Sequence, residues 1–355
     1  MKKSKFKLFA ALLLAAAMTV LSLSGAAPVL ADETAAIFAN AAKSPAMHTA
    51  PEGYDQNDFT KVRTFLEQTD SNGIRNGEKL NPDGYDPDDP ESWGALFVDE
   101  WGFEHEAYFD WEEVDGINRM FAINLTYIRD FAGTFDMSGL DALSTLDVDG
   151  GNFTTADLSN CYEMTHCYFA NSTLSSVNLF NCANVTELYL QDNELTEVLN
   201  LGDCTSLLFL DILMNNDLEE IDLSGCERII EHLDFSQTKV SDVNETEMFA
   251  LCEFGCESSG ITELDLRNCN YLNYVNCNFC DMDFLYLPEL PNNLAVNCME
   301  TGLTELNYES CGGIYDLSIS GNPGLTGKLN LASNPYLMNV SADNCGFTEI
   351  DAAGC

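Results

Sequence analysis

Residues 185–204 read VTELYLQDNELTEVLNLGDC, and the spacing within this stretch decides the fold. Leucines and valines recur along it, an asparagine stands at position 193, and it closes on Cys204. Cysteines recur at regular intervals along the chain. Cys161, Cys182, Cys204 and Cys226 lie 21, 22 and 22 residues apart, and Cys269, Cys311 and Cys355 continue the series in double steps. A fixed period in the twenties is the sequence signature of a solenoid.

A second motif runs in phase with the cysteines. In residues 185–195 it has the form Val-x-x-Leu-x-Leu-x-x-Asn-x-Leu, and related segments follow along the chain. One such unit cannot bury its apolar face alone, so neighbouring units must stack with parallel strands. The second strand position of each unit predicts eleven strands, at Leu125, Val148, Phe169, Leu190, Ile212, Phe235, Phe254, Cys277, Cys298, Ile319 and Ala342. We interpret the short interval of 19 residues between Phe235 and Phe254 as an irregular turn near residues 249–260.

The two motifs together resemble the leucine-rich repeat family, and the recurring cysteine is similar to that of exported bacterial proteins of the internalin type. The resemblance implies an α/β-type solenoid dominated by β structure, with a parallel sheet on its concave side. It also implies a small helical N-terminal cap. Residues 56–118 are similar to leucine-rich repeat N-terminal domains in having a helix, then a turn-rich segment, then a segment rich in tryptophan. Those domains usually carry paired cysteines, which are absent from this segment.

The N-terminal segment predicts export. Residues 1–31 have four lysines, then an apolar run, then small residues, which is typical of a secretory signal peptide cleaved near Ala31. The small and polar residues of segment 32–55 predict disorder. We expect the mature protein to be secreted or held at the cell surface.

The rest of the chain divides into the cap and the repeats. Within the cap, residues 58–68 place apolar side chains on one helical face, with Asn57 or Asp58 as the N-cap. The repeats fill residues 119–355, and no C-terminal cap follows. This ending leaves two interpretations, a longer natural protein or a shortened reading frame.

The charge of the chain excludes one class of partner. The sequence has 15 basic and 58 acidic residues and a formal net charge of −43 at pH 7. A phosphate backbone would repel such a chain, so we exclude nucleic acid as a partner.

No apolar stretch after the signal peptide is long enough to span a membrane. We expect a monomer.

The recurring cysteines predict a structural ladder. Stacked repeats would align the cysteines at one turn and asparagines at the other, with Cys161, Cys182, Cys204, Cys226, Cys269, Cys311 and Cys355 on the first side and Asn193, Asn215 and Asn322 on the second. An even count of 14 cysteines in an exported chain would ordinarily indicate disulfides. Parallel Cβ directions, however, give poor disulfide geometry. We therefore favour buried, reduced thiols that pack as small hydrophobic groups, with the asparagines satisfying turn backbone groups.

Metal and catalytic motifs are weak. Asp83, Asp86 and Asp88 form an acidic loop that is a weak calcium candidate, and a solvated turn is the preferred interpretation. Residues 147–158 resemble part of a calcium loop but lack its final glutamate. His166 and His232 should lie three strands apart, roughly 14 Å, too far to share a metal or a proton. We predict no metal site, no cofactor and no enzymatic activity.

The concave face is the predicted binding site. Strand alternation directs one set of side chains outward, namely His166, Tyr168, Glu187, Tyr189, Gln191, Phe209, Asp211, His232 and Asp234. Exposed aromatic residues among acids suit a binding patch, although Tyr and Phe also favour strands for their own sake.

The main hypothesis is an exported, non-catalytic binding protein that recognises a protein or glycan partner in adhesion or another host or surface interaction. The acids favour a cationic partner. The alternatives are the targeting arm of a larger secreted enzyme and a structural cell-surface protein.

Overall fold

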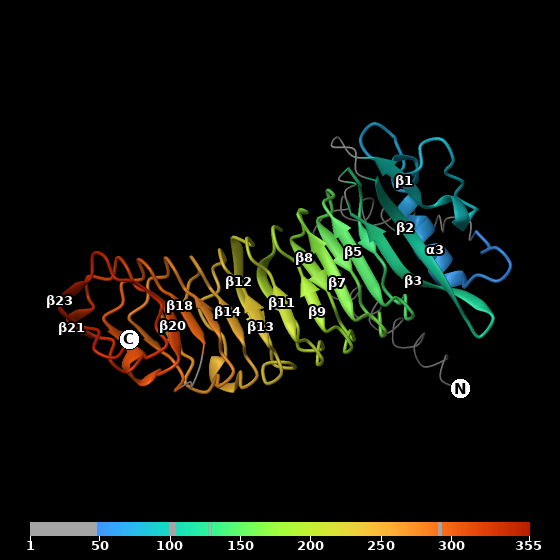
Figure 1. Ribbon diagram of the computed structural model, residues 1–355. Coiled ribbons are helices and arrows are strands. Elements are labelled where there is room, and N and C mark those ends of the chain that lie inside the picture. The colour runs from blue at the N-terminus through green and yellow to red at the C-terminus, as the bar shows by residue number, and fades with distance from the viewer. Residues whose placement is uncertain (1–47, 99–103, 127, 129, 290–292) are drawn as a thin grey trace, which may run out of the picture. The chain divides into compact units, whose positions relative to one another are not determined.

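One large sheet organises the protein. The computed structural model describes residues 48–98, 104–126, 128, 130–289 and 293–355. Within the unit Thr49–Cys355, thirteen strands form a single sheet and are stacked almost entirely in chain order (Figure 1). The strands of this sheet are β1 (Ala95–Val98), β2 (Glu104–Val114), β3 (Ile117–Leu125), β5 (Thr145–Asp149), β7 (His166–Ala170), β9 (Glu187–Tyr189), β11 (Phe209–Asp211), β13 (His232–Asp234), β14 (Glu253–Gly255), β16 (Tyr274–Asn276), β18 (Leu294–Asn297), β20 (Ile314–Ser318) and β22 (Asn339–Ser341). The eleven strands from β3 to β22 pair in parallel, which confirms the prediction of a β-dominated leucine-rich repeat solenoid.

The second extended segment of each repeat forms smaller sheets on the other side of the core. These are a sheet of β4 (Phe135–Asp136), β6 (Thr155–Asp157) and β8 (Ser176–Asn178), a sheet of β10 (Thr196–Asn200) and β12 (Asp217–Asp222), a sheet of β15 (Glu263–Asp265), β17 (Phe284–Tyr286) and β19 (Glu305–Leu306), and a sheet of β21 (Thr326–Asn330) and β23 (Gly346–Asp351). A short 3-10 helix, η2 (Glu245–Glu247), takes the place of the extended segment between β13 and β14, and a second, η3 (Tyr308–Ser310), follows β19. One continuous hydrophobic core fills the space between the layers.

The strand register corrects one interpretation from the sequence. Leu233 of β13 pairs with Phe254 of β14, and Phe254 pairs with Val275 of β16. Phe254 therefore occupies the first core position of its strand, and Cys256 occupies the second. The step from Phe235 to Cys256 is 21 residues, so the irregular interval of 19 residues does not exist. The misassignment arose because a phenylalanine is a more obvious core residue than a cysteine, although Cys256, two positions later, is also buried.

The cysteine turn is built from buried thiols. The thiols of Cys161 and Cys182 donate to the carbonyls of Met137 (3.3 Å) and Leu158 (3.1 Å) in the preceding repeat. Asn334 is buried at the equivalent place in its own repeat and donates to a carbonyl in the same way. The 14 cysteines all lie in the described residues, and none of them forms a disulfide there. Six of the seven predicted ladder cysteines are buried, and Cys355 is exposed. These contacts support the reduced ladder, which remains a prediction.

The opposite turn uses asparagine. The buried Asn215 donates from Nδ2 to the carbonyls of Leu190 (3.0 Å) and Ile212 (2.8 Å), and its Oδ1 accepts from the amide of Leu195 (3.1 Å). One side chain thus satisfies backbone groups of its own repeat and of the preceding repeat. Asn193 and Asn322 occupy the same position and act in the same way. Buried backbone groups need such partners because an unpaired group is costly.

The N-terminal cap contains helices and strands. The helices are α3 (Gln56–Leu66), α4 (Asn76–Leu80) and the 3-10 helix η1 (Pro90–Ser92). Phe59 of α3 stacks on the buried Trp93 with ring centroids 5.3 Å apart. The antiparallel strands β1, β2 and β3 extend the large sheet under α3 (Figure 1). The expected small helical cap is therefore also a β-hairpin extension of the solenoid.

The helix boundaries differ from the prediction of 58–68. The helix spans Gln56–Leu66, and Asp55 is its N-cap, accepting from the amides of Asn57 (2.8 Å) and Asp58 (3.1 Å). Asp58 has another role, since its fully buried carboxylate pairs with the Nε of Arg119 at 2.8 Å. The predicted disordered segment 32–55 is ordered at least at its end, because Tyr54 bridges to strand β3. The signal peptide 1–31, the cleavage near Ala31 and residues 32–47 lie outside the described residues.

Candidate functional site

An aromatic row crosses four neighbouring strands of the large sheet. We call the exposed face of strands β5 to β14 the open sheet face, and the row on it consists of His166, Tyr168, Tyr189, Phe209 and His232. Ring centroids are 5.9 Å apart for Tyr168 and Tyr189, and 4.8 Å for Tyr189 and Phe209. Phe209 and His232 stack face to face at 3.9 Å with an interplanar angle of 3°. Parallel register pairs Tyr168 with Tyr189 and Phe209 with His232. Tyr189 and Phe209 are diagonal neighbours, because Phe209 pairs with Glu187.

His166 stands between two carboxylates. Its Nε2 lies 3.2 Å from Asp147 Oδ1, and its Nδ1 lies 3.2 Å from Glu187 Oε2. The hydrogen bond to Asp147 is the main reason why the pKa of His166 is raised above its usual value of 6.5, and Glu187 adds to the effect. The hydroxyl of Tyr189 also donates to Glu187 (3.4 Å). Protonation of His166 would therefore cancel negative charge on this part of the face.

Two aspartates continue the face beside the aromatic row. Asp211 and Asp234 are cross-strand partners, and they accept from the backbone amides of Leu213 (3.2 Å) and Ser236 (2.8 Å). Burial is the main reason why the pKa of Asp211 is raised, and the neighbouring Asp234 adds to it. Asp234 lies over Gly255, where an added Cβ would come within 2.5 Å of its Cγ. The glycine on β14 therefore makes room for this carboxylate.

A pocket of about 460 Å³ opens on the same face. It is lined by Thr186, Glu187, Tyr189, Leu208, Phe209, Glu231, His232, Cys252 and Glu253. Glu253 Oε2 lies 2.9 Å from His232 Nδ1. Three glutamates thus surround a pocket whose aromatic residues are Tyr189, Phe209 and His232. No lysine or arginine occurs in the large-sheet strands from β5 to β22.

The structure places the nine predicted face residues on or directly after the strands of the open sheet face. Eight of the nine belong to strands β7 to β13, whereas Gln191 follows β9. The side chain of Gln191 is half-buried, and the described residues give its Oε1 no hydrogen-bond partner. Glu231 and Glu253 were not predicted to lie on the face, and Asp147 was considered only as part of a calcium loop. Strand alternation directs Glu253 outward whichever core position Phe254 takes, so the sequence could have identified it.

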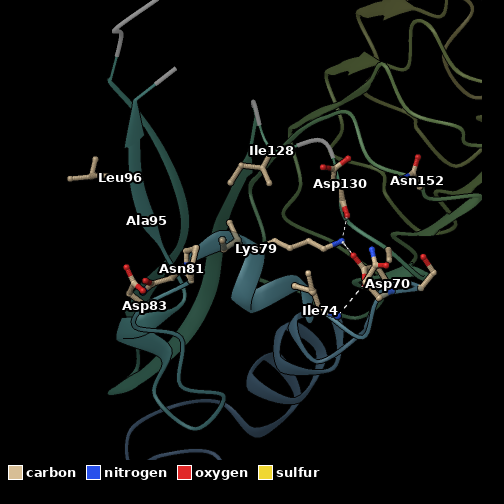
Figure 2. A pocket seen from close by; sticks show the side chains of 15 residues that line it. Asp70, Ile74, Lys79, Asn81, Asp83, Ala95, Leu96, Ile128, Asp130 and Asn152 are labelled. Carbon is tan, nitrogen blue, oxygen red and sulfur yellow. Dashed lines mark hydrogen bonds and ion pairs between the residues drawn. The ribbon is translucent and has the colours of Figure 1, made fainter. Parts of the chain in front are cut away.

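A larger cavity lies between the N-terminal cap and the first repeats (Figure 2). Its volume is about 1030 Å³, and its lining mixes apolar side chains such as Ile74 and Leu96 with polar ones. Lys79 points across it to Asp70 and Asp130, pairing with the Asp70 carboxylate at 3.0 Å and donating to the Asp130 carbonyl (Figure 2). This lysine is therefore already paired within the cap.

The weak calcium candidates do not converge. Asp88 pairs with Arg63 at 2.7 Å, and Asp86 accepts from the Asp88 amide at 2.9 Å. Asp147 faces His166 on the open sheet face, whereas Asp157 lies on the other side of the core on β6. Among the described residues, no group of three or more His, Cys, Asp or Glu side chains could hold a metal ion. Across the same residues, every helix is too short or too polar to cross a bilayer.

Comparison with known proteins gives matches to solved structures. No protein-family model and no curated protein matches this sequence. One solved structure is the functional domain of InlJ from Listeria monocytogenes, which includes a cysteine ladder; at 18% identity and a TM-score of 0.39, the match covers 66% of this chain and 65% of that domain. A second is the internalin InlF from the same species, at 14% identity and a TM-score of 0.39, covering 87% of this chain and 99% of that one. A third is YopM from Yersinia enterocolitica, at 16% identity and a TM-score of 0.29, covering 65% and 70%.

Proposed function

We propose that this leucine-rich repeat protein is an exported, non-catalytic binding protein whose open sheet face recognises a protein partner with a basic surface. The observation that carries the proposal is the aromatic row, His166 to His232, flanked by carboxylates on strands that have no lysine or arginine. Export is proposed from the signal-like sequence of residues 1–31.

The composition of the face favours a protein partner. Aromatic side chains supply large contact areas, and they are enriched among the residues that dominate binding energy at protein interfaces. The rings lie on a sheet that is anchored to a continuous core, so little conformational freedom would be lost when a partner docks. Clustered carboxylates and a net charge of −43 would steer a basic protein to the face.

The histidines and the pocket cysteine support a binding role rather than a catalytic one. His166 and His232 are each held by carboxylates. Cys252 lines the pocket with His232, but its thiol donates to the Ala250 carbonyl at 3.4 Å. Burial, with the nearby glutamates, raises the pKa of Cys252, and the thiolate is the nucleophilic form of cysteine. Nothing in this geometry activates the sulfur.

A glycan is the second candidate partner. Strands β16 to β20 carry Tyr274, Asn276, Asn297 and Ser318 on the same face, and Asn297 donates to the Tyr274 hydroxyl at 3.4 Å. A tyrosine with amides and hydroxyls can recognise sugar hydroxyl groups. A targeting arm of a larger enzyme and a structural surface protein are the remaining alternatives.

The proposal is tested by screening the purified protein against protein and glycan arrays. We expect it to bind proteins with basic surfaces. Replacing Tyr168, Tyr189 and Phe209 together by Ala should abolish that binding. The matched control is Phe180→Ala, because Phe180 is 57% exposed but lies on the opposite layer, after β8. Binding that survives the triple replacement would exclude the open sheet face, and binding to glycans alone would favour the second candidate.

A further inference from the structure

A partner with a basic surface needs a site that binds its cationic side chains, and the pocket on the open sheet face is the candidate for that site. Resting on the proposed function, we propose that the pocket bounded by Glu187, Glu231 and Glu253 takes one lysine or arginine side chain of the partner. The ammonium or guanidinium group would lie at the end of the pocket formed by Glu231 and Glu253, because Glu187 is three strands away from Glu253. Its aliphatic stem would lie on the rings of Tyr189 and Phe209.

The aromatic residues of the pocket suit a cation. Phe209 lies between Tyr189 and His232, at 4.8 Å from the first ring and 3.9 Å from the second. These neighbours cover both faces of Phe209, so the row offers its ring edges to the apolar stem of a partner side chain and leaves the charged end to the carboxylates. Lysine and arginine also bury long apolar stems along such surfaces while their charged ends stay near polar groups. Leu208, which is 37% exposed, adds an apolar wall for the stem.

The three glutamates supply the charge. Glu187 and Glu253 are held in place by His166 and His232, at 3.2 Å and 2.9 Å. Glu231 lines the same pocket with an exposed side chain. Among the described residues, no lysine or arginine pairs with any of these three carboxylates. Histidines are the partners of Glu187 and Glu253, so a lysine or arginine from outside would be a stronger partner for these carboxylates.

The size and position of the pocket indicate a side chain that belongs to a larger surface. Its volume of about 460 Å³ lies within the range of about 300–1,000 Å³ that is usual for ligand pockets. The aromatic row continues beyond the pocket to Tyr168 and His166 on β7. Residues next to the inserted side chain would rest on those rings. The row thus provides contact area, and the pocket provides a specific anchor.

The test is a titration of the purified full chain with three tripeptides, acetyl-Gly-X-Gly-amide, in which X is lysine, arginine or the neutral norleucine. Ring signals of selectively labelled Tyr and Phe are followed by NMR. We expect the lysine or the arginine peptide to shift the signals of Tyr189 and Phe209, and norleucine to leave them unchanged. Equal shifts with norleucine would overturn the proposal, because the pocket would then be apolar rather than cation-selective.

Charge-removing variants complete the test. Glu231→Gln together with Glu253→Gln should weaken binding of the cationic peptide by about tenfold, which corresponds to 1.4 kcal/mol. Glu263→Gln is the matched control, since Glu263 is an exposed glutamate on β15 in the opposite layer, and it should change nothing. Unchanged affinity in the double variant would overturn the proposal. If the double variant still binds the partner protein but the triple aromatic variant does not, the proposed function stands without this pocket. If both bind the partner, the proposed function falls as well.

Discussion

Asn322 should be the most costly asparagine of the turn ladder to remove. Its side chain is fully buried, and its Oδ1 accepts from the amides of Thr301 (3.1 Å) and Leu303 (3.1 Å) and from the Thr301 hydroxyl (2.8 Å). Its Nδ2 donates to the carbonyls of Cys298 (2.7 Å) and Ile319 (2.8 Å). Both carbonyls have a second donor among the described residues, whereas the two amides have no other acceptor there. Asn322→Ala therefore orphans two buried N–H groups.

The expected magnitude follows from that count. Leaving a buried hydrogen-bonding group unsatisfied costs about 1–3 kcal/mol, so two orphaned amides should reduce the free energy of unfolding by about 2–6 kcal/mol. Asn193 is the matched comparison, because its Oδ1 accepts only from the amide of Leu174 (3.1 Å). Asn193→Ala should therefore cost about 1–3 kcal/mol, roughly half as much. The exposed Asn339 serves as a control, and its replacement by Ala should change stability by less than about 0.5 kcal/mol.

Urea denaturation followed by circular dichroism would measure these three variants. Unfolding can lose its cooperativity in long repeat arrays. Hydrogen exchange of the Thr301 and Leu303 amides should therefore be measured in addition to urea denaturation. We expect both amides to exchange faster in Asn322→Ala. An Asn193→Ala variant that is less stable than Asn322→Ala, with exchange at Thr301 and Leu303 unchanged, would refute the reasoning.

Three further predictions concern the open sheet face and the thiols. Gly255→Ala should reduce the free energy of unfolding by about 1–3 kcal/mol in urea denaturation, because the new Cβ would meet Asp234 at 2.5 Å; an unchanged midpoint would contradict this. Affinity for a basic partner should fall several-fold as pH drops through the raised pKa of His166, above 6.5, because the imidazolium then cancels the charge of its two carboxylate partners. His166→Gln should flatten that pH profile in biolayer interferometry, and an identical profile would exclude His166 as the titrating group. Iodoacetamide should label the exposed Cys355 long before Cys182, which is buried and whose pKa burial raises to about 11. Under denaturing, non-reducing conditions mass spectrometry should find all 14 cysteines labelled, and widespread protection there would indicate disulfides.

The repeat period was sufficient to predict the solenoid. Each outward position follows from two buried neighbours, so identifying Leu188 and Leu190 as core residues placed Glu187 and Tyr189 on the open face. The same logic failed in one repeat. There Phe254 was assigned to the second core position instead of the first, although a shift of two residues leaves Glu253 directed outward. A cysteine in a core position carries a weaker sequence signal than a leucine.

The N-terminal cap was less predictable because its structure depends on contacts between distant residues. Asp58 was a plausible N-cap from local sequence alone. In the folded protein its carboxylate instead accepts from Arg119 and from the amide of Met120 (3.0 Å), more than sixty residues away. Asp55 takes over the cap. Such pairs leave no periodic pattern in the sequence. The helix boundary and the strands β1 to β3 therefore could not be predicted from the sequence alone.

The pocket was also beyond the reach of the sequence. Glu231 precedes β13 and Cys252 precedes β14, so neither occupies a regular outward strand position. Glu231 and Cys252 line the same pocket as Phe209 because the turns of three consecutive repeats pack beside the sheet. The period predicts which strands are neighbours, but it does not predict the shape of the space between their turns.

The central claim is that a protein partner docks on the open sheet face, and hydroxyl-radical footprinting of the complex tests it most directly. The measurement compares side-chain oxidation rates with and without a partner retrieved in the binding screen. We predict that oxidation of Tyr189 and Phe209 slows several-fold in the complex while that of Phe180, on the opposite layer, stays the same. Slower oxidation of Phe180 with unchanged Tyr189 and Phe209 would contradict the claim and would place the partner on the other side of the solenoid.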